Sequence, residues 1–181
     1  MKLLYFIVIV GLSSIFVACG NAGNNSTTRD YRVFVKSSEP EVQNQFKMLV
    51  QDFNQSVGLQ VLQFETSAEE ATSPIALIAG LQRTTGKLGY GGVLYHVNRS
   101  GLMRERTAAM QIELDMAYVR SRLPSSKGTV AYDDLRLLFF HEVGHGLGFG
   151  HATDLSDVMY SDLNGSKDYL TFYQQVRAIY D

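Results

Sequence analysis

The sequence predicts an α+β fold in a single domain, on three observations. Short segments with alternating apolar and polar residues, typical of β-strands, recur between residues 31 and 116. In separate, longer segments the apolar residues recur every three or four positions, which is typical of α-helices. With 181 residues, 45% of them hydrophobic and 19% charged, the composition fits one globular domain with a short extension.

The first part of the domain is expected to form a strand, a helix and a second strand. Apolar side chains alternate along residues 31–36, and they recur at helical spacing along residues 42–57. Pro40 suits a first helical turn, where its missing N–H is not needed, and Gly58 suits the end of a helix. Residues 59–66 follow as the second strand.

The middle of the domain supplies three more predicted strands. Pro74 opens a short apolar run, residues 75–79, that we interpret as a buried strand. A glycine-rich loop then leads into a strand over residues 93–97, and residues 111–116 alternate cleanly. Residues 124–128 are a predicted loop.

Two further helices are predicted near the C-terminus. The first covers residues 133–147, with Asp133 as its N-cap and with Tyr132 and Leu137 forming a hydrophobic staple. This helix is apolar nearly all round, so we expect it to be buried. The second helix lies within residues 169–180 and carries three tyrosines and a valine on one side.

The N-terminus indicates a targeting signal. Lys2 precedes an apolar run over residues 3–18, which is too short for a convincing membrane span and fits a secretory signal. The stretch Phe16-Val17-Ala18-Cys19 resembles a bacterial lipobox, which implies cleavage before Cys19 and lipidation of its thiol. The alternative is a plain signal peptide followed by a free cysteine.

These features divide the chain into a signal peptide (1–18), a lipidated cysteine with a polar, glycine-rich tether (19–28) and a folded domain (29–181). The lipobox implies a protein anchored at a bacterial envelope and facing outside the cytoplasm, at the outer membrane in a Gram-negative cell. The net charge of −2 argues against nucleic-acid binding, and one cysteine excludes an internal disulfide. We expect a monomer.

Three of the four histidines lie in HEVGHGLGFGH, residues 141–151. On a helix, His141 and His145 project from the same face and can bind one zinc ion. Gly148 tolerates the left-handed backbone that ends a helix, so the chain can turn and bring back His151 as a third ligand. Three protein ligands leave one coordination position open, as in catalytic zinc sites.

Glu142 is not needed as a ligand and is placed to act as the general base, taking the proton of a water molecule polarised by zinc. The segment matches all five specified positions of the pattern H-E-x-x-H-x-x-G-x-x-H. The probability of a chance match at any one start position is far below ~1 in a million. This specificity argues against the alternative that the histidines only fill the core.

These residues resemble the active site of the metzincin zinc endopeptidases. The resemblance implies a zincin-like domain with a twisted mixed sheet, a long active-site helix, a methionine turn and a C-terminal helix. Met159, in Asp157-Val158-Met159-Tyr160, is then the turn methionine, an apolar floor under the metal. Within the clan, residues 151–160 are most similar to the matrixins, although Ser161 replaces their proline after the tyrosine.

A weaker resemblance lies upstream. Residues 91–96 are similar to the matrixin edge strand that binds substrate by backbone pairing. His96 is expected to be an ordinary strand residue, because no further histidine remains for a second, structural zinc. The substrate-binding residues implied by the resemblance are Gly92, Val93, Leu94, Tyr95 and Tyr160.

The sequence thus predicts an endopeptidase with one catalytic zinc ion that hydrolyses extracytoplasmic proteins or peptides. A calcium site has no support, because the oxygen-bearing residues Asp162, Asn164 and Asp168 lack the spacing of a known loop. With no second cysteine and no room for a pro-domain, the enzyme should be competent once folded and metallated. The alternatives are a non-catalytic surface-binding lipoprotein on this scaffold, which the intact Glu142 disfavours, and a narrow processing protease or toxin.

Overall fold

The computed structural model describes residues 27–100, 103–164 and 167–180. The predicted signal peptide, Cys19 and the tether up to residue 26 lie outside the described residues. The first strand, β1 (Thr27–Arg29), pairs with a strand of the main sheet. Thr27 and Thr28, which were predicted to belong to the tether, thus lie in a strand of the sheet.

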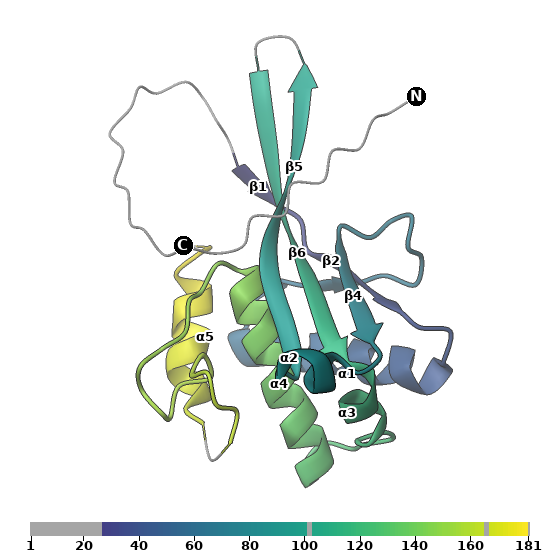
Figure 1. Ribbon diagram of the computed structural model, residues 1–181. Helices are drawn as coiled ribbons and strands as arrows, with labels where there is room; N and C mark the ends of the chain where they lie inside the picture. Colours follow the sequence, from purple (N-terminus) through teal and green to yellow (C-terminus); the bar gives the residue numbers. More distant parts are fainter. Residues whose placement is uncertain (1–26, 101–102, 165–166, 181) are drawn as a thin grey trace.

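The domain is built on a mixed sheet of six described strands (Figure 1). Besides β1 these are β2 (Arg32–Lys36), β3 (Gln63–Phe64), β4 (Ser73–Ile78), β5 (Gly89–Ser100) and β6 (Met103–Asp115). The path β3–β2–β4–β6 is parallel throughout, and β5 pairs antiparallel with β6 as an edge strand. Because β5 occupies one edge of β6, β1 and β4 share the other: β1 pairs with residues 106–108 and β4 with residues 112–115.

Strands β5 and β6 form a long hairpin that projects past the rest of the sheet (Figure 1). Their register runs from Gly89 opposite Leu114 to Ser100 opposite Met103. The predicted strands at 93–97 and 111–116 were therefore too short. Backbone pairing between the two strands extends them beyond the segments in which apolar and polar residues alternate. Met116, predicted to end the second strand, instead begins helix α3 (Met116–Arg120).

The predicted strand over residues 59–66 shrinks to β3. The reason is the side chain of Asn54, which lies on helix α1. Its Oδ1 accepts hydrogen bonds from the N–H groups of Val61 and Leu62, at 3.0 and 2.9 Å, and its Nδ2 donates to the Leu62 carbonyl at 2.7 Å. These backbone groups are bound by a side chain instead of by a neighbouring strand. Most of the predicted run at 75–79 lies in β4, but only Ile75 of that run is buried, and the other side chains are partly exposed.

Helix α1 (Pro40–Val57) agrees with its prediction and ends at Gly58, whose φ of 78° is left-handed. Helix α4 (Val130–Gly146) begins three residues before the predicted start, because Thr129 is the N-cap and its hydroxyl accepts from Tyr132 N at 3.3 Å. Asp133 therefore lies in the first turn, and the predicted staple of Tyr132 with Leu137 was wrong. Two other helices are α2 (Leu81–Thr85), which was not predicted, and α5 (Tyr169–Arg177).

The core lies between one face of the sheet and helices α1, α4 and α5. Aromatic rings join the helices: Phe46 meets Phe139 at 5.8 Å between centroids, and Phe53 meets Phe140 at 5.0 Å. The sheet contributes side chains that are fully buried, namely Val33, Val35, Ile75, Ile112 and Leu114. This packing holds α4, the helix that carries the histidines, firmly against the sheet.

A polar network also ties α1 to α4. The buried carboxylate of Asp52 accepts from Lys127 Nζ at 2.6 Å and from the Tyr132 hydroxyl at 3.2 Å, and it lies 2.8 Å from Arg136 Nε. The Arg136 guanidinium also stacks over the Tyr169 ring of α5, 4.2 Å from its centroid. Three helices thus meet at one ionic cluster.

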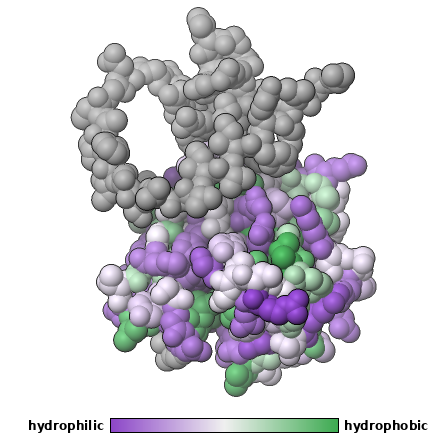
Figure 2. Space-filling model, in the orientation of Figure 1, coloured by the Kyte–Doolittle hydropathy of each residue, from purple (hydrophilic) through white to green (hydrophobic). Residues whose placement is uncertain are grey.

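The described surface seen in Figure 2 is mixed, with hydrophilic residues spread over it and hydrophobic residues in small, separate patches. Among the described helices, none combines the length and the apolar character needed to cross a membrane.

Candidate metal centre

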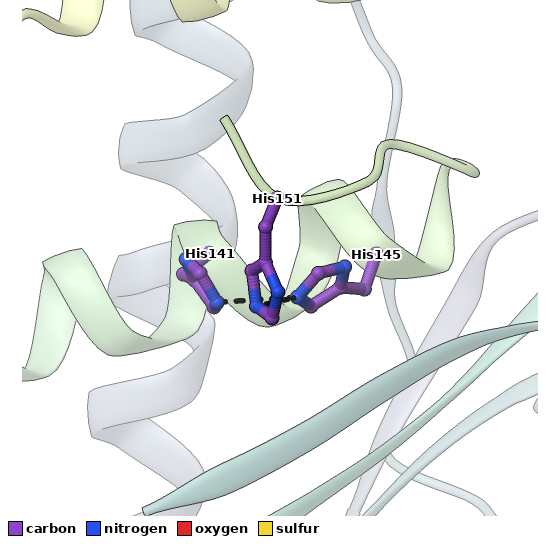
Figure 3. Close-up of side chains that lie close together, drawn as sticks. All are labelled: His141, His145 and His151. Atoms are coloured by element: carbon purple, nitrogen blue, oxygen red, sulfur yellow. Dashed lines mark hydrogen bonds between the residues drawn. The ribbon is translucent and has the colours of Figure 1, made fainter. Parts of the chain in front are cut away.

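Three imidazoles converge at the C-terminal end of α4 (Figure 3). His141 and His145 project from the helix, and His151 reaches toward them from the chain beyond it. The His145 Nε2 atom lies 3.1 Å from His141 Nε2 and 3.2 Å from His151 Nε2. The structure thus brings together the three histidines that the sequence indicated as ligands.

The hydrogen bonds of two rings fix which nitrogen faces the centre. His141 Nδ1 lies 2.8 Å from the Val158 carbonyl, and His145 Nδ1 lies 2.8 Å from the Phe149 carbonyl. A carbonyl oxygen only accepts, so each Nδ1 carries the proton and donates it. In the neutral rings both Nε2 atoms therefore present lone pairs to each other, an arrangement without a hydrogen bond between them.

In the folded protein, protonation of the two rings does not relieve the repulsion between their Nε2 lone pairs. Burial lowers the pKa of His141 to about 4 and also lowers the pKa of His145. The residues fit a metal ion instead, since two nitrogens bound to one tetrahedral zinc at 2.0–2.1 Å lie about 3.3 Å apart. The Nε2–Nε2 separations of 3.1 and 3.2 Å in the structure are close to that value.

The turn after α4 brings His151 back to the helix. The Leu147 N–H donates to the carbonyl of Val143, at 2.8 Å, and the Phe149 N–H donates to the carbonyl of Gly144, at 2.9 Å. Between them Gly148 has a φ of 99°, a conformation that side chains other than glycine rarely adopt. This glycine therefore ends the helix in the way the sequence predicted, and the Phe149 carbonyl that follows it positions His145.

The segment Asp157–Tyr160 forms a turn beneath the histidines. Met159 is 2% exposed, and its N–H donates to Asp157 Oδ1 at 2.7 Å while its carbonyl accepts from Ala152 N at 3.0 Å. A Cβ on Gly144 would collide with the Met159 sulfur, so the helix and the turn touch only because residue 144 is glycine. Met159 thus packs under the helix, and the preceding carbonyl, of Val158, holds His141.

The side chain of Glu142, a residue of α4, lies between this helix and strand β5. It is 4% exposed, its Oε2 has no hydrogen-bond partner among the described residues, and burial raises the pKa of this carboxyl group to about 8. The strand approaches closely through two glycines: a Cβ on Gly89 would lie 2.6 Å from Glu142 Oε1, and one on Gly91 would collide with the Glu142 backbone carbonyl. The glycines of β5 therefore set the distance between the strand and this carboxyl group.

The histidines and Glu142 open into a cleft of about 630 Å³. Residues 86–91, from the α2 turn into β5, form one part of its wall, and residues 161–164 form another. The cleft continues along α4 past Leu138 to Asp134. Tyr118 and Arg122 close this end.

The predicted substrate-binding residues lie on the expected edge strand but outside the lining of this cleft. The segment of β5 that lines it is Gly89–Gly91, just before Gly92, Val93, Leu94 and Tyr95. Tyr160 is also outside the lining, and its ring faces Lys167 Nζ at 5.2 Å. Their role in substrate binding stays a prediction. The side chain of His96 lies outside the described residues, and its backbone pairs with Thr107 in β6.

The residues considered for calcium have local roles in the structure. Asp162 Oδ1 accepts from the backbone and side-chain nitrogens of Asn164, at 3.0 and 2.6 Å. Asp168 caps α5 by accepting from Leu170 N at 2.9 Å. Among the described residues, the group arranged to hold a metal ion is the histidine trio.

The sequence did not indicate the far end of the cleft. Arg122 stacks on Tyr118, 3.5 Å from its ring centroid, and pairs with Asp134 at 3.1 Å. Tyr118 lies on α3, a helix of five residues that has too few positions to show a periodicity. A signal was present in Asp115, which precedes this helix and caps it by accepting from Tyr118 N at 2.8 Å.

No protein-family model and no curated protein matches the chain. Among solved structures, the fold is similar to the crystal structure of archaemetzincin from Methanopyrus kandleri, with a TM-score of 0.44 and 13% sequence identity. The match covers 86% of this chain and 96% of that one. A likeness this distant carries no argument about the site. The geometry by itself defines the class: a mixed α/β domain whose three-histidine group can hold a metal ion.

Proposed function

We propose that the protein is a zinc-dependent endopeptidase of the metzincin type, with one zinc ion held by His141, His145 and His151. The observation that carries the proposal is the convergence of three Nε2 atoms beside a buried carboxyl group in one open cleft. Two helical ligands and a third from a turn leave one side of the centre facing the cleft. The all-nitrogen ligand set and its spacing support zinc.

When bound, zinc supplies a Lewis acid that polarises the scissile carbonyl and makes water acidic enough to react at neutral pH. Glu142 supplies the base. Its side chain lines the same cleft and is shielded from bulk water. Because burial raises its pKa, the Glu142 carboxylate binds a proton more strongly than a solvent-exposed carboxylate does. We assign to it the removal of a proton from the attacking water and its return to the leaving amine.

The edge strand supports a peptide as the substrate. Strand β5 uses one edge to pair with β6, and no described strand pairs with the other. Its residues Gly89, Tyr90 and Gly91 line the cleft beside Glu142. An extended substrate can therefore add to the sheet through its own N–H and C=O groups, a mode that binds main chain whatever the sequence.

The matrixin-like subtype rests on residues 151–160 and on the turn that they form. In that turn Met159 packs under the helix, and the Val158 carbonyl accepts a hydrogen bond from His141 Nδ1. Ser161, at the position of the matrixin proline, lies in the cleft wall, so the wall of this protein differs at that point from the matrixin pattern.

The test uses the full chain in detergent, loaded with zinc, and a peptide library derived from a proteome. Glu142→Gln should keep its zinc, since Glu142 is outside the ligand set, and should lose about 10²–10⁴-fold in kcat/KM, the usual contribution of a general base. Each His→Ala change should reduce the zinc content measured by elemental analysis. Cleavage by Glu142→Gln at the wild-type rate would refute the endopeptidase and favour a surface-binding lipoprotein on the same scaffold.

We further propose that the enzyme is anchored to a bacterial envelope by a lipid on Cys19 and acts outside the cytoplasm. The support is the lipobox-like stretch and the polar segment after it. Mass spectrometry of the purified protein should find a lipid-modified N-terminus at Cys19, and Cys19→Ser should abolish the modification. An unmodified N-terminus elsewhere would contradict this assignment.

A further inference from the structure

The charged side chains that line the cleft, apart from Glu142, differ in whether they have an ion-pair or hydrogen-bond partner. Arg122 is paired with Asp134, and Asp162 accepts hydrogen bonds from Asn164. Lys87, which also lines the cleft, has no carboxylate within ion-pair distance among the described residues. Among the described residues, Lys87 is therefore a cation of the cleft that forms no ion pair.

The backbone around Lys87 is held in place. Its N–H donates to Thr85 Oγ1 at 3.1 Å, and the next carbonyl, of Leu88, accepts from Asp115 N at 2.8 Å. Asp115 also accepts from Gln82 N at 3.0 Å, which ties the preceding helix α2 to the same point. Gly86, with a φ of 74°, makes the turn between them. Lys87 thus projects from a fixed base and not from a loose loop.

The ammonium group of Lys87 is also positioned. It lies 4.6 Å from the centroid of the Tyr90 ring, a cation–π contact within the same wall segment, residues 86–91. Lys87 lines the same cleft as Glu142 and the three histidines, which form the proposed reaction centre. A peptide bound along β5 would therefore pass close to this ammonium group.

We propose that Lys87 is a specificity-determining residue that binds a carboxylate of the peptide substrate near the scissile bond. This inference rests on the proposed function. The ammonium group offers three N–H donors, and a carboxylate satisfies them while balancing the charge. The carboxylate can come from an aspartate or glutamate side chain or from the C-terminus of a short peptide.

The experiment measures kcat/KM of the zinc-loaded full chain on matched peptides. One arm compares Glu with Gln at each position on either side of the scissile bond, and a second arm compares a free C-terminus with an amide. At one position or at the C-terminus, the wild type should prefer the carboxylate about fivefold, the upper range for an exposed ion pair, and salt should weaken the preference.

Variants separate binding of a carboxylate from a general structural role. Lys87→Gln should remove the preference by lowering kcat/KM on the Glu peptides about fivefold more than on the matched Gln peptides, and Lys87→Glu should reverse the preference. Lys47→Gln, which removes an exposed lysine of α1, is the matched control and should keep the preference. An equal loss on every peptide in Lys87→Gln would overturn the inference, as would equal wild-type rates on each matched pair.

Binding distinguishes this inference from the proposed function. If no peptide is cleaved, the endopeptidase proposal fails, and dissociation constants of the same pairs then decide about Lys87. Tighter binding of the carboxylate peptide, lost in Lys87→Gln, supports the inference, and equal binding overturns it.

Discussion

The contact between β5 and α4 gives a sharp prediction for two neighbouring glycines. A Cβ on Gly91 would lie 2.8 Å from the carbonyl carbon of Glu142 and closer still to its oxygen, whereas a Cβ on Gly92 would meet nothing within 4 Å. Neither glycine has a positive φ, so alanine fits the backbone conformation at both. The two substitutions therefore differ in the space available and not in backbone strain.

The expected magnitude follows from the atoms involved. Ordinary contact begins at 3.4 Å, and the new Cβ of Gly91→Ala, which has no rotamer of its own, meets backbone atoms of Glu142, so no side chain can rotate away. Overpacking costs about 1–3 kcal/mol, and this rigid case should lie near 3. Gly92→Ala should instead gain about 0.4–1 kcal/mol, because alanine restricts the unfolded chain.

Thermal unfolding followed by circular dichroism checks this difference. A loss of 1 kcal/mol lowers the Tm of a domain of this size by about 2–4 °C, so Gly91→Ala should melt about 6–12 °C below wild type. Its kcat/KM should also fall, because the strand that moves away lines the cleft. If Gly91→Ala and Gly92→Ala melt at the same temperature, the strand does not rest on the Glu142 backbone and the reasoning is wrong.

Two further predictions concern buried carboxyl groups. In the metal-free protein the folded state keeps a proton on Glu142, whose pKa is raised from 4.5 to about 8, while the unfolded state releases it. The free energy of unfolding of the wild type should therefore fall relative to that of Glu142→Gln as pH rises from 4.5 to 8. Urea unfolding with a chelator at several pH values measures both free energies. A difference between them that stays constant with pH would contradict the prediction. Asp52→Ala should cost about 3 kcal/mol, because it leaves the cationic partners of a largely buried carboxylate unpaired. In urea unfolding the control Asp133→Ala, an exposed acid in the first turn of α4, should cost less than about 1 kcal/mol, and equal losses would refute the role of the Asp52 cluster.

Local spacing explains what the sequence predicted correctly. The i, i+4 relation of His141 and His145 depends only on the helix, and the return of His151 depends on a glycine a few residues away. Helix α1 is bounded by a proline and a glycine, so its ends were also visible locally. The N-cap of α4 was misplaced because Thr129 and Asp133 are both competent caps, and the choice depends on where the preceding loop meets the core.

Features that depend on distant partners were not predictable in the same way. The length of the β5–β6 hairpin is set by pairing between the strands, and the short β3 is set by the Asn54 side chain. The cleft wall at Lys87 and the end at Arg122 come from segments that only the fold brings to α4. No pattern in either segment marks them as neighbours of the histidines.

The pairing of β1 with β6 bears on how far from a bilayer the proposed lipid-anchored enzyme could work. Thr27 lies beside Arg106, while Gly91 lies beside Ile112, six residues further along β6 and about 20 Å away. A chain anchored at Cys19 enters the fold at the near end of that distance, and residues 19–26 span at most about 28 Å. The proposed enzyme would then cut targets within roughly 50 Å of the lipid surface, which suits neighbours held in the same envelope better than proteins free in the medium.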